Sequence, residues 1–151
     1  LLNNRMTYWH LDKGHPNYLE SNKKVRHTMN PFMATTVQNN NKPSLVFLGG
    51  TPGADTQVLT NLQLLTNLID FKMSLKEAVE SKRFHHQWLP DVIMMEPRGL
   101  SKDVMNNLKL RGHTLIPYRW GYIGEANGIV IDENGFFGGG DVRGETSAKG
   151  Y

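Results

Sequence analysis

The chain has 151 residues, 38% of them hydrophobic and 21% charged, so it can form one domain with a core but hardly two. Its 17 Lys and Arg residues exceed its 14 Asp and Glu residues by only three and are scattered, which argues against a nucleic-acid partner. It has no cysteine, which excludes disulfides, thiolate catalysis and zinc–thiolate sites, and no apolar run has the length of a membrane span.

The amino-terminal region is polar and rich in turn-forming residues. The chain opens with Leu1-Leu2-Asn3-Asn4 where a complete gene product has an initiator methionine, so we expect a fragment or a processed piece. The stretch from Leu1 to Met6 is bounded by turn formers and indicates a short strand. Residues 10–26 contain glycine, proline, asparagine and lysines, a composition typical of a solvated loop.

A hairpin and a long helix come next. Two apolar, β-branched runs, Phe32–Val37 and Ser44–Leu48, flank an Asn-rich segment and predict a β-hairpin. After a glycine-containing turn at residues 49–53, apolar residues recur at helical spacing and predict a helix from about Asp55 to Asp70. Its apolar stripe consists of Val58, Leu59, Leu62, Leu65, Leu68 and Ile69.

Capping residues mark two further helices. Ser74 and Glu77 have the spacing of a capping box, which predicts a short helix that ends near Lys82. Ser101 and Gly112 are placed to begin and end another helix. Its apolar positions are Val104, Met105, Leu108 and Leu110.

Short strands complete the pattern. Val92–Met95 and Thr114–Ile116 are apolar runs of strand length, and Asn134-Gly135 joins Gly128–Asp132 to Phe136–Gly138 with the strongest short hairpin signal in the chain. Hairpins and helices therefore occur in segregated order. This order indicates a layered α+β fold rather than alternating βαβ units.

The turn Thr51-Pro52-Gly53-Ala54 is the first candidate site. Pro52 presets its own φ and Gly53 can take a positive φ, so a type II turn is expected between a buried strand and a helix. Such a turn leaves backbone N–H groups without partners, and they could bind an anion or a developing oxyanion. The alternative is a tight strand-to-helix connection, which the spacing alone favours.

Two polar clusters could bind a carboxylate. His27 and Thr28 offer a ring nitrogen and a hydroxyl close together, although such side chains often bond to their own backbone in loops. Arg5, near Tyr8, could clamp a carboxylate or simply lie on the surface.

His85 and His86 suggest a metal site at first sight. Adjacent residues point in different directions, however, so both rarely reach one ion, and a packing role is the better interpretation. We expect neither a metal nor a cofactor.

Several segments together resemble the gamma-glutamyltransferase family. The most specific is Phe84-His85-His86-Gln87-Trp88-Leu89-Pro90, preceded by Arg83. Further matches are Leu1-Leu2-Asn3-Asn4, Gly14-His15-Pro16-Asn17, the stretch from His27 to Pro31, Gly50 to Gly53, Asp141-Val142-Arg143 and Gly150-Tyr151. The resemblance covers essentially the whole chain, as a single partial domain over residues 1–151 from the carboxy-terminal part of the small subunit.

The resemblance implies a four-layer αββα sandwich of the N-terminal-nucleophile hydrolases. It also implies a precursor that cuts itself, a large-subunit partner, and a threonine nucleophile that transfers a γ-glutamyl group from amides such as glutathione to water or an amine. Gly53 and Ala54 match the oxyanion-hole positions, and Arg5, Tyr8, His27 and Thr28 match substrate-binding positions. Leu1 has no nucleophilic atom, so we expect this chain alone to be inactive.

Three departures from the family pattern affect these expectations. Ala54 replaces a second glycine and can still donate if its φ is not forced positive. His27-Thr28 replaces a serine pair that holds the α-carboxylate. Arg5 and Tyr8 replace residues that receive the substrate's α-amino group, and a cationic Arg5 would repel that ammonium.

Two alternatives therefore stay open. One is an acylase of the same superfamily that prefers a glutaryl-type acyl group, which lacks the ammonium. The other is a catalytically dead fragment with a structural or binding role.

Overall fold

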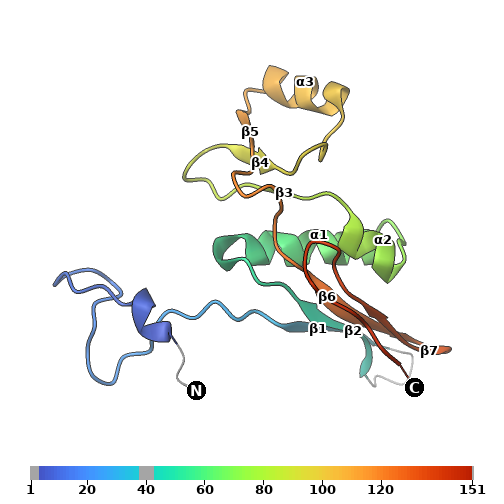
Figure 1. Cartoon of the computed structure of the whole chain (residues 1–151), viewed down its shortest axis with the longest axis horizontal. Helices are drawn as coiled ribbons and strands as arrows, with labels where there is room; N and C mark the ends of the chain where they lie inside the picture. The colour runs from blue at the N-terminus through green and yellow to red at the C-terminus, as the bar shows by residue number, and fades with distance from the viewer. Residues whose placement is uncertain (1–3, 38–42, 151) are drawn as a thin grey trace.

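The computed structural model describes residues 4–37 and 43–150. Its strands form two sheets, one with the order β1-β2-β6-β7 and one with the order β3-β4-β5, and helices accompany both (Figure 1). The predicted α+β class is confirmed.

The larger sheet is antiparallel throughout and is built from two hairpins. β1 (Phe32–Val37) pairs with β2 (Pro43–Gly50), as predicted, and the register shifts between Ala34 and Thr35. β6 (Asn127–Asp132) pairs with β2 and with β7 (Gly135–Gly139). The turn of the second hairpin consists of Glu133 and Asn134, one residue before the predicted Asn-Gly pair, and Gly135 follows with a φ of +130° and pairs with Asp132.

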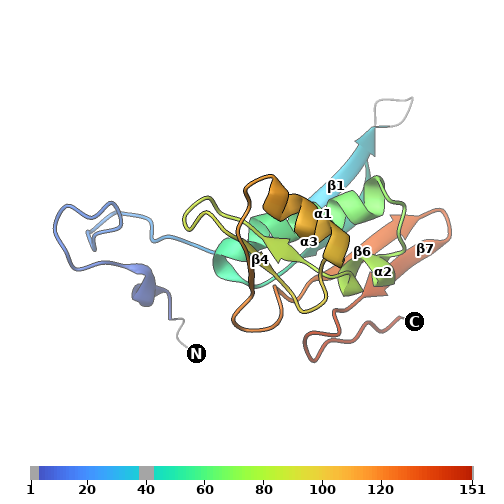
Figure 2. The ribbon, with the colours of Figure 1, turned by 90° about the horizontal axis from the view of Figure 1, so that it is seen from above.

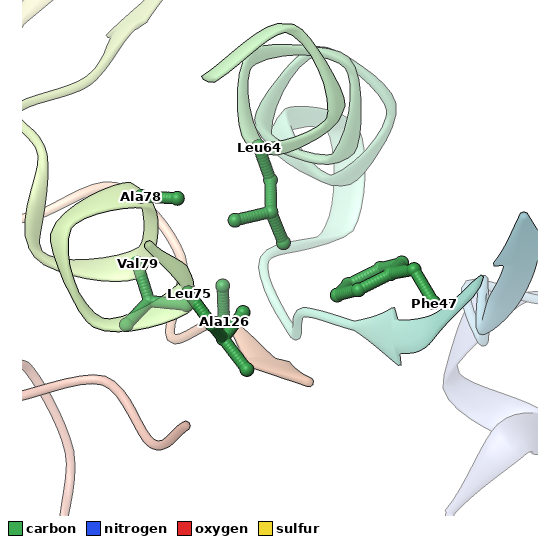
Figure 3. Packing of buried hydrophobic residues seen from close by; sticks show 6 residues of the cluster. All are labelled: Phe47, Leu64, Leu75, Ala78, Val79 and Ala126. Carbon is green, nitrogen blue, oxygen red and sulfur yellow. The ribbon is translucent and has the colours of Figure 1, made fainter. Parts of the chain in front are cut away.

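Two helices cover one face of this sheet, as Figure 1 shows: α1 (Gln57–Ile69) and α2 (Leu75–Glu80). The capping box predicted at Ser74 and Glu77 is present with both of its hydrogen bonds. The helices and the sheet enclose a small apolar core (Figure 3). Its buried members are Phe47, Leu64, Leu75, Ala78, Val79 and Ala126.

The stripe predicted on α1 is partly wrong. Leu65 and Leu68 pack partly against the core, but Val58 and Leu62 are 71% and 57% exposed. The face turned inward is mostly polar, with Gln57, Thr60, Asn61 and Leu64 buried. Periodicity detects every apolar side of a helix, and on α1 one of these sides is open to solvent.

The opposite face of the larger sheet has no helix over it (Figure 1). Paired strand residues share a face, so Met33, Leu48 and Ile129, which pair across β1, β2 and β6, lie together there. Phe136 and Ile131 pair on the same side. Met33 and Phe136 are 74% and 78% exposed, so this face is apolar and largely open.

The smaller sheet contains one parallel pair. β4 (Ile93–Met95) is followed by α3 (Lys102–Leu110) and by β5 (Leu115–Pro117), which runs parallel to β4. This is a βαβ crossover, so the expectation of segregated order is wrong in this part of the chain. β3 (Phe84–His85) pairs antiparallel with β4 and was not predicted, because two residues are too few for a periodic signal.

The amino-terminal arm extends away from the body in both views (Figures 1 and 2). Arg5–Tyr8 is a 3₁₀ helix, so the strand predicted over residues 1–6 is wrong for its described part. The hydroxyl and the N–H of Thr7 both donate to Asn4 O, at 2.9 and 3.4 Å, a local bonding that favours a turn over a strand. Residues 10–26 form the predicted loop, with a single bridge between His10 and Tyr18. Leu1-Leu2-Asn3 and the segment 38–42 lie outside the described residues.

No helix within residues 4–37 or 43–150 is long and apolar enough to cross a membrane.

Candidate active site

The turn between β2 and α1 contains the positive φ that the sequence predicts at Gly53. Gly53 has a φ of +135°, which L side chains rarely adopt. A Cβ on Gly53 would collide with Thr56 Oγ1, so a larger residue would displace that hydroxyl. The chain then forms a single 3₁₀ turn, η2 (Ala54–Thr56), and enters α1.

Ala54 also lies in the left-handed region, with a φ of +50°. The sequence-based expectation required that this φ not be positive, and the structure contradicts that condition. A left-handed alanine costs about 1–2 kcal/mol relative to a right-handed one, because its Cβ crowds the backbone. The amide itself is not impaired: Gly53 and Ala54 are exposed residues, and their N–H groups donate to no acceptor in the described part of the chain.

A cavity of about 560 Å³ joins this turn to the amino-terminal arm. Among its lining residues are five of the six positions predicted as site residues: Arg5, Tyr8, Thr28, Gly53 and Ala54. The sequence separates these positions by up to 49 residues (54 − 5), and the fold brings them to one cavity. Arg5 Nη1 donates to Thr28 Oγ1 at 3.1 Å, and the Arg5 guanidinium lies 5.5 Å from the centre of the Tyr8 ring.

His27 is placed differently. It is exposed and does not line the cavity. Its Nδ1 accepts a hydrogen bond of 3.0 Å from the N–H of Met29, which is the local backbone bonding weighed above as the alternative. A role for His27 in substrate binding stays a prediction.

Sequence reasoning missed the polar face of α1 behind the turn. Gln57 lines the cavity and is buried, and Asn61 Nδ2 donates to Asn30 O at 3.2 Å, which ties α1 to the segment before β1. Gln57, Thr60 and Asn61 have the spacing of one helical face, so the signal was present in the sequence. The apolar stripe on the same helix obscured it.

A second cavity of about 310 Å³ lies beside the same turn and includes His85 and Gln87. His85 is buried, and its Nε2 lies 2.8 Å from Gln87 Oε1, whereas His86 Nε2 lies 3.0 Å from Asp91 Oδ1. The two histidines therefore have separate partners, and only His85 is buried, whereas His86 is exposed. The described residues contain no cluster of three or more His, Asp and Glu able to hold a metal.

A buried network of four charges lies behind the turn. Arg143 makes a two-pronged ion pair with Glu96, with Nε and Nη2 each 2.7 Å from a carboxylate oxygen. Arg83 Nη2 and Arg143 Nη1 donate to the two oxygens of Asp141, at 2.6 and 2.9 Å. Each of the four side chains is at most 3% exposed, and two cations balance two anions.

Backbone groups complete this network. The N–H of Ile123 donates to Glu96 at 2.8 Å, its carbonyl accepts from Arg83 at 2.8 Å, and the N–H of Ala126 donates to Asp141 at 2.8 Å. The network thus fixes both ends of the segment 123–126. The sequence analysis noted Arg83 and Asp141-Val142-Arg143 only as parts of family motifs. Nothing local in the sequence shows that these side chains form ion pairs with one another.

The two carboxylates remain ionised despite their burial. Burial alone would raise the pKa of Glu96, but hydrogen bonds from Arg143 and from the N–H groups of Ile123 and Arg83 hold that pKa below its usual range. Burial alone would likewise raise the pKa of Asp141. There, N–H groups of Arg143 and Ala126, the Arg143 side chain and the Arg83 charge lower the pKa.

Comparison with known proteins places the chain in a family. The sequence model described as Gamma-glutamyltranspeptidase matches residues 1–151. This chain belongs to the gamma-glutamyltranspeptidase family. It is 32% identical to the glutathione hydrolase proenzyme of Escherichia coli over 95% of the chain, but covers only 25% of that protein. The chain thus spans about a quarter of the length of the curated relatives that it matches.

Solved structures of the family share its fold. The gamma-glutamyltranspeptidase of Pseudomonas nitroreducens in complex with L-DON is similar with a TM-score of 0.82 and 27% identity, over all of this chain and 81% of that chain. The cephalosporin acylase of Bacillus halodurans is similar with a TM-score of 0.77 and 26% identity, over 98% of this chain and 27% of that chain. Transpeptidases and an acylase therefore share this architecture.

Proposed function

We propose that the chain is part of a gamma-glutamyltransferase or glutathione hydrolase in which Gly53 and Ala54 form the oxyanion hole. One observation carries the proposal: two consecutive amides in a left-handed turn have no acceptor in the described part of the chain and border a cavity with Arg5 and Thr28. Oxyanion holes are built from backbone N–H groups arranged in this way.

The proposed reaction uses a nucleophile from the rest of the protein. The hydroxyl of an amino-terminal threonine attacks the amide carbon of the substrate and gives its proton to its own α-amino group. The carbonyl oxygen becomes an oxyanion and accepts hydrogen bonds from Gly53 and Ala54. Collapse of this intermediate expels the amine, which takes up the proton, and water or an acceptor amine then attacks the acyl-enzyme.

Replacing a single amide by an ester tests this assignment in the complete processed enzyme. An α-hydroxy acid at position 53 or 54 removes one N–H and leaves φ free to stay positive. Loss of one oxyanion donor lowers kcat by about 10²–10³. Gly53→Pro is a poorer probe, because proline fixes φ near −65° and Gly53 has a φ of +135°. A folded ester variant with normal kcat would place the oxyanion hole elsewhere.

Arg5 favours a second candidate function, a glutaryl-type acylase. Arg5 and Thr28 are hydrogen-bonded to each other at the cavity and offer donors to an acyl-chain carboxylate. The ammonium of a γ-glutamyl group would meet the Arg5 charge, a mismatch of about 1–3 kcal/mol, or roughly tenfold to a hundredfold in specificity.

The two candidates differ in a measurable preference. The second candidate predicts that the processed enzyme gives a higher kcat/KM with a glutaryl anilide than with a γ-glutamyl anilide, and the first predicts the reverse. The combined substitutions Arg5→Gln and Tyr8→Asp should move the preference toward γ-glutamyl. A wild-type enzyme that strongly prefers γ-glutamyl would favour the transferase and assign ammonium recognition to other residues.

The proposed partner is the large subunit of the same precursor. Two open apolar surfaces support it: the helix-free face of the sheet around Met33 and Phe136, and the outer side of α1 around Val58 and Leu62. In a four-layer sandwich a second sheet packs on the first of these surfaces. A dead structural fragment is the remaining alternative, and the absence of an upstream threonine from the parent gene would favour it.

A further inference from the structure

Two threonine hydroxyls bond to the carbonyls of the turn that holds the proposed oxyanion hole. Thr51 Oγ1 donates to Pro52 O at 2.8 Å. Thr56 Oγ1 donates to Gly53 O at 2.9 Å, and the N–H of Thr56 donates to the same oxygen at 3.0 Å. Both threonines are buried, at 7% and 5% exposure.

These carbonyls belong to the same two peptide units as the proposed oxyanion donors. Pro52 O shares a peptide plane with the N–H of Gly53, and Gly53 O shares one with the N–H of Ala54. In a trans peptide the C=O and N–H bonds point in opposite directions, and the unit is rigid. A hydroxyl that fixes the carbonyl therefore also fixes the direction of the N–H.

The need for such a restraint follows from Gly53 itself. Glycine adopts positive and negative φ almost equally well, so the peptide units on its two sides can rotate at little cost. A rotated unit would turn its N–H away from the proposed oxyanion site and leave the oxyanion without a donor. Preorganised donors are effective because they need no reorientation during the reaction.

The Thr51 hydroxyl also accepts a hydrogen bond from a distant segment of the chain. Its Oγ1 accepts a hydrogen bond of 2.9 Å from the N–H of Glu125. A Cβ on Gly124 would lie 2.6 Å from the same oxygen, so only glycine lets the segment approach this closely. Ile123 and Ala126, on either side, are bonded to the buried charge network. The turn is thus connected by hydrogen bonds to the most buried charges described in the chain.

We propose that Thr51 and Thr56 are positioning residues that direct the amides of Gly53 and Ala54 toward the oxyanion. This inference rests on the proposed oxyanion hole. Their hydroxyls act on the transition state only through the peptide units, so their loss should lower kcat and leave KM nearly unchanged.

The test uses isosteric substitutions in the complete processed enzyme. Thr51→Val and Thr56→Val remove the hydroxyl and keep the side-chain volume. We expect kcat with a chromogenic anilide substrate to fall by about tenfold to a hundredfold, and KM to change by less than about threefold. Thr51→Ser and Thr56→Ser keep the hydroxyl and should recover most of the loss.

Thr60 provides a matched control. It is 1% exposed on α1, close to Gly124, and its Oγ1 has no hydrogen-bond partner among the described residues. Thr60→Val should therefore keep the wild-type kcat. If a Val variant fails to fold or to process, the Ala and Ser variants at the same position make the same comparison.

The outcomes separate this inference from the proposed function. Folded Val variants with wild-type kcat, or Ser variants as impaired as their Val counterparts, would overturn the positioning role. Ester variants at positions 53 and 54 with normal kcat would overturn the oxyanion hole itself. Impaired ester variants combined with normal Val variants would leave the oxyanion hole in place and refute only the role of the hydroxyls.

Discussion

Glu96→Gln should destabilise the folded protein strongly, although it changes neither the size nor the shape of the side chain. Glu96 accepts four hydrogen bonds. Ile123 N–H and Arg143 Nε bind Oε1, and Arg83 N–H and Arg143 Nη2 bind Oε2. A glutamine amide has one oxygen and one NH₂ group, so in either orientation its NH₂ faces one backbone N–H and one guanidinium N–H.

The magnitude follows from these contacts. A lost neutral hydrogen bond costs about 1 kcal/mol and a lost bond to a charged group about 1.5–3 kcal/mol. Arg143 also keeps its charge with one anion fewer in a buried network, where removal of one partner of an ion pair typically costs about 3–5 kcal/mol. We therefore expect Glu96→Gln to lower the free energy of unfolding by about 3–5 kcal/mol.

Urea unfolding of the complete enzyme measures this loss from the shift of the midpoint multiplied by the slope. The matched control is Arg26→Gln, which breaks the ion pair of Arg26 with Asp55 at the surface. These side chains are 54% and 56% exposed, so that pair should contribute less than about 1 kcal/mol. A shift for Glu96→Gln no larger than the control would refute the assignment of the network as a main source of stability.

Three further predictions follow from the same structure. The lowered pKa values of Glu96 and Asp141 stabilise the fold at every pH above the ordinary pKa range of carboxyl groups. The free energy of unfolding should therefore stay level above about pH 5 and fall below about pH 4. Glu96→Gln should reduce that fall in acid titrations. Ala54→Val should lower the melting temperature and Ala54→Gly should not, because a β-branched residue tolerates a positive φ poorly; equal melting temperatures would contradict this. The isolated chain should be inactive, bind a hydrophobic dye and lack a sharp melt, because its sheet and α1 expose apolar faces; a cooperative melt as a monomer would count against it.

The elements that the sequence predicted well are those with local signals. Ser74 and Ser101 cap their helices within a few residues, and the Asn134-Gly135 signal lies within one residue of a hairpin turn, so these signals mark helix starts and a hairpin directly. β3 and the 3₁₀ helix at Arg5–Tyr8 are too short to show a period. The inward face of α1 was misjudged because a polar and an apolar face both show helical spacing, and the layers that cover the helix decide which of the two turns inward.

The candidate site divides in the same way. Gly53 was predicted from its turn. Arg5 and Thr28 were predicted from their side-chain chemistry and, together with Tyr8, from a family resemblance, and all of them line one cavity. The hydroxyl bonds of Thr51 and Thr56 depend on backbone angles that only the folded turn defines. The charge network joins residues 83, 96, 141 and 143, and such distant pairings leave no periodic trace in one sequence.

The composition of that network bears on how it can act on the site. It contains two guanidinium groups and two carboxylates within hydrogen-bond distance of one another, so its net charge is zero. A neutral cluster has a weak field at a distance, and it can add little direct attraction for an oxyanion. Its contacts with Ile123 and Ala126 lead instead to Glu125 and Thr51, and so to the carbonyl of Pro52. The influence of the buried charges on catalysis should therefore be geometric: they position the segment 123–126, which positions the turn, and with it the N–H groups of the proposed oxyanion hole.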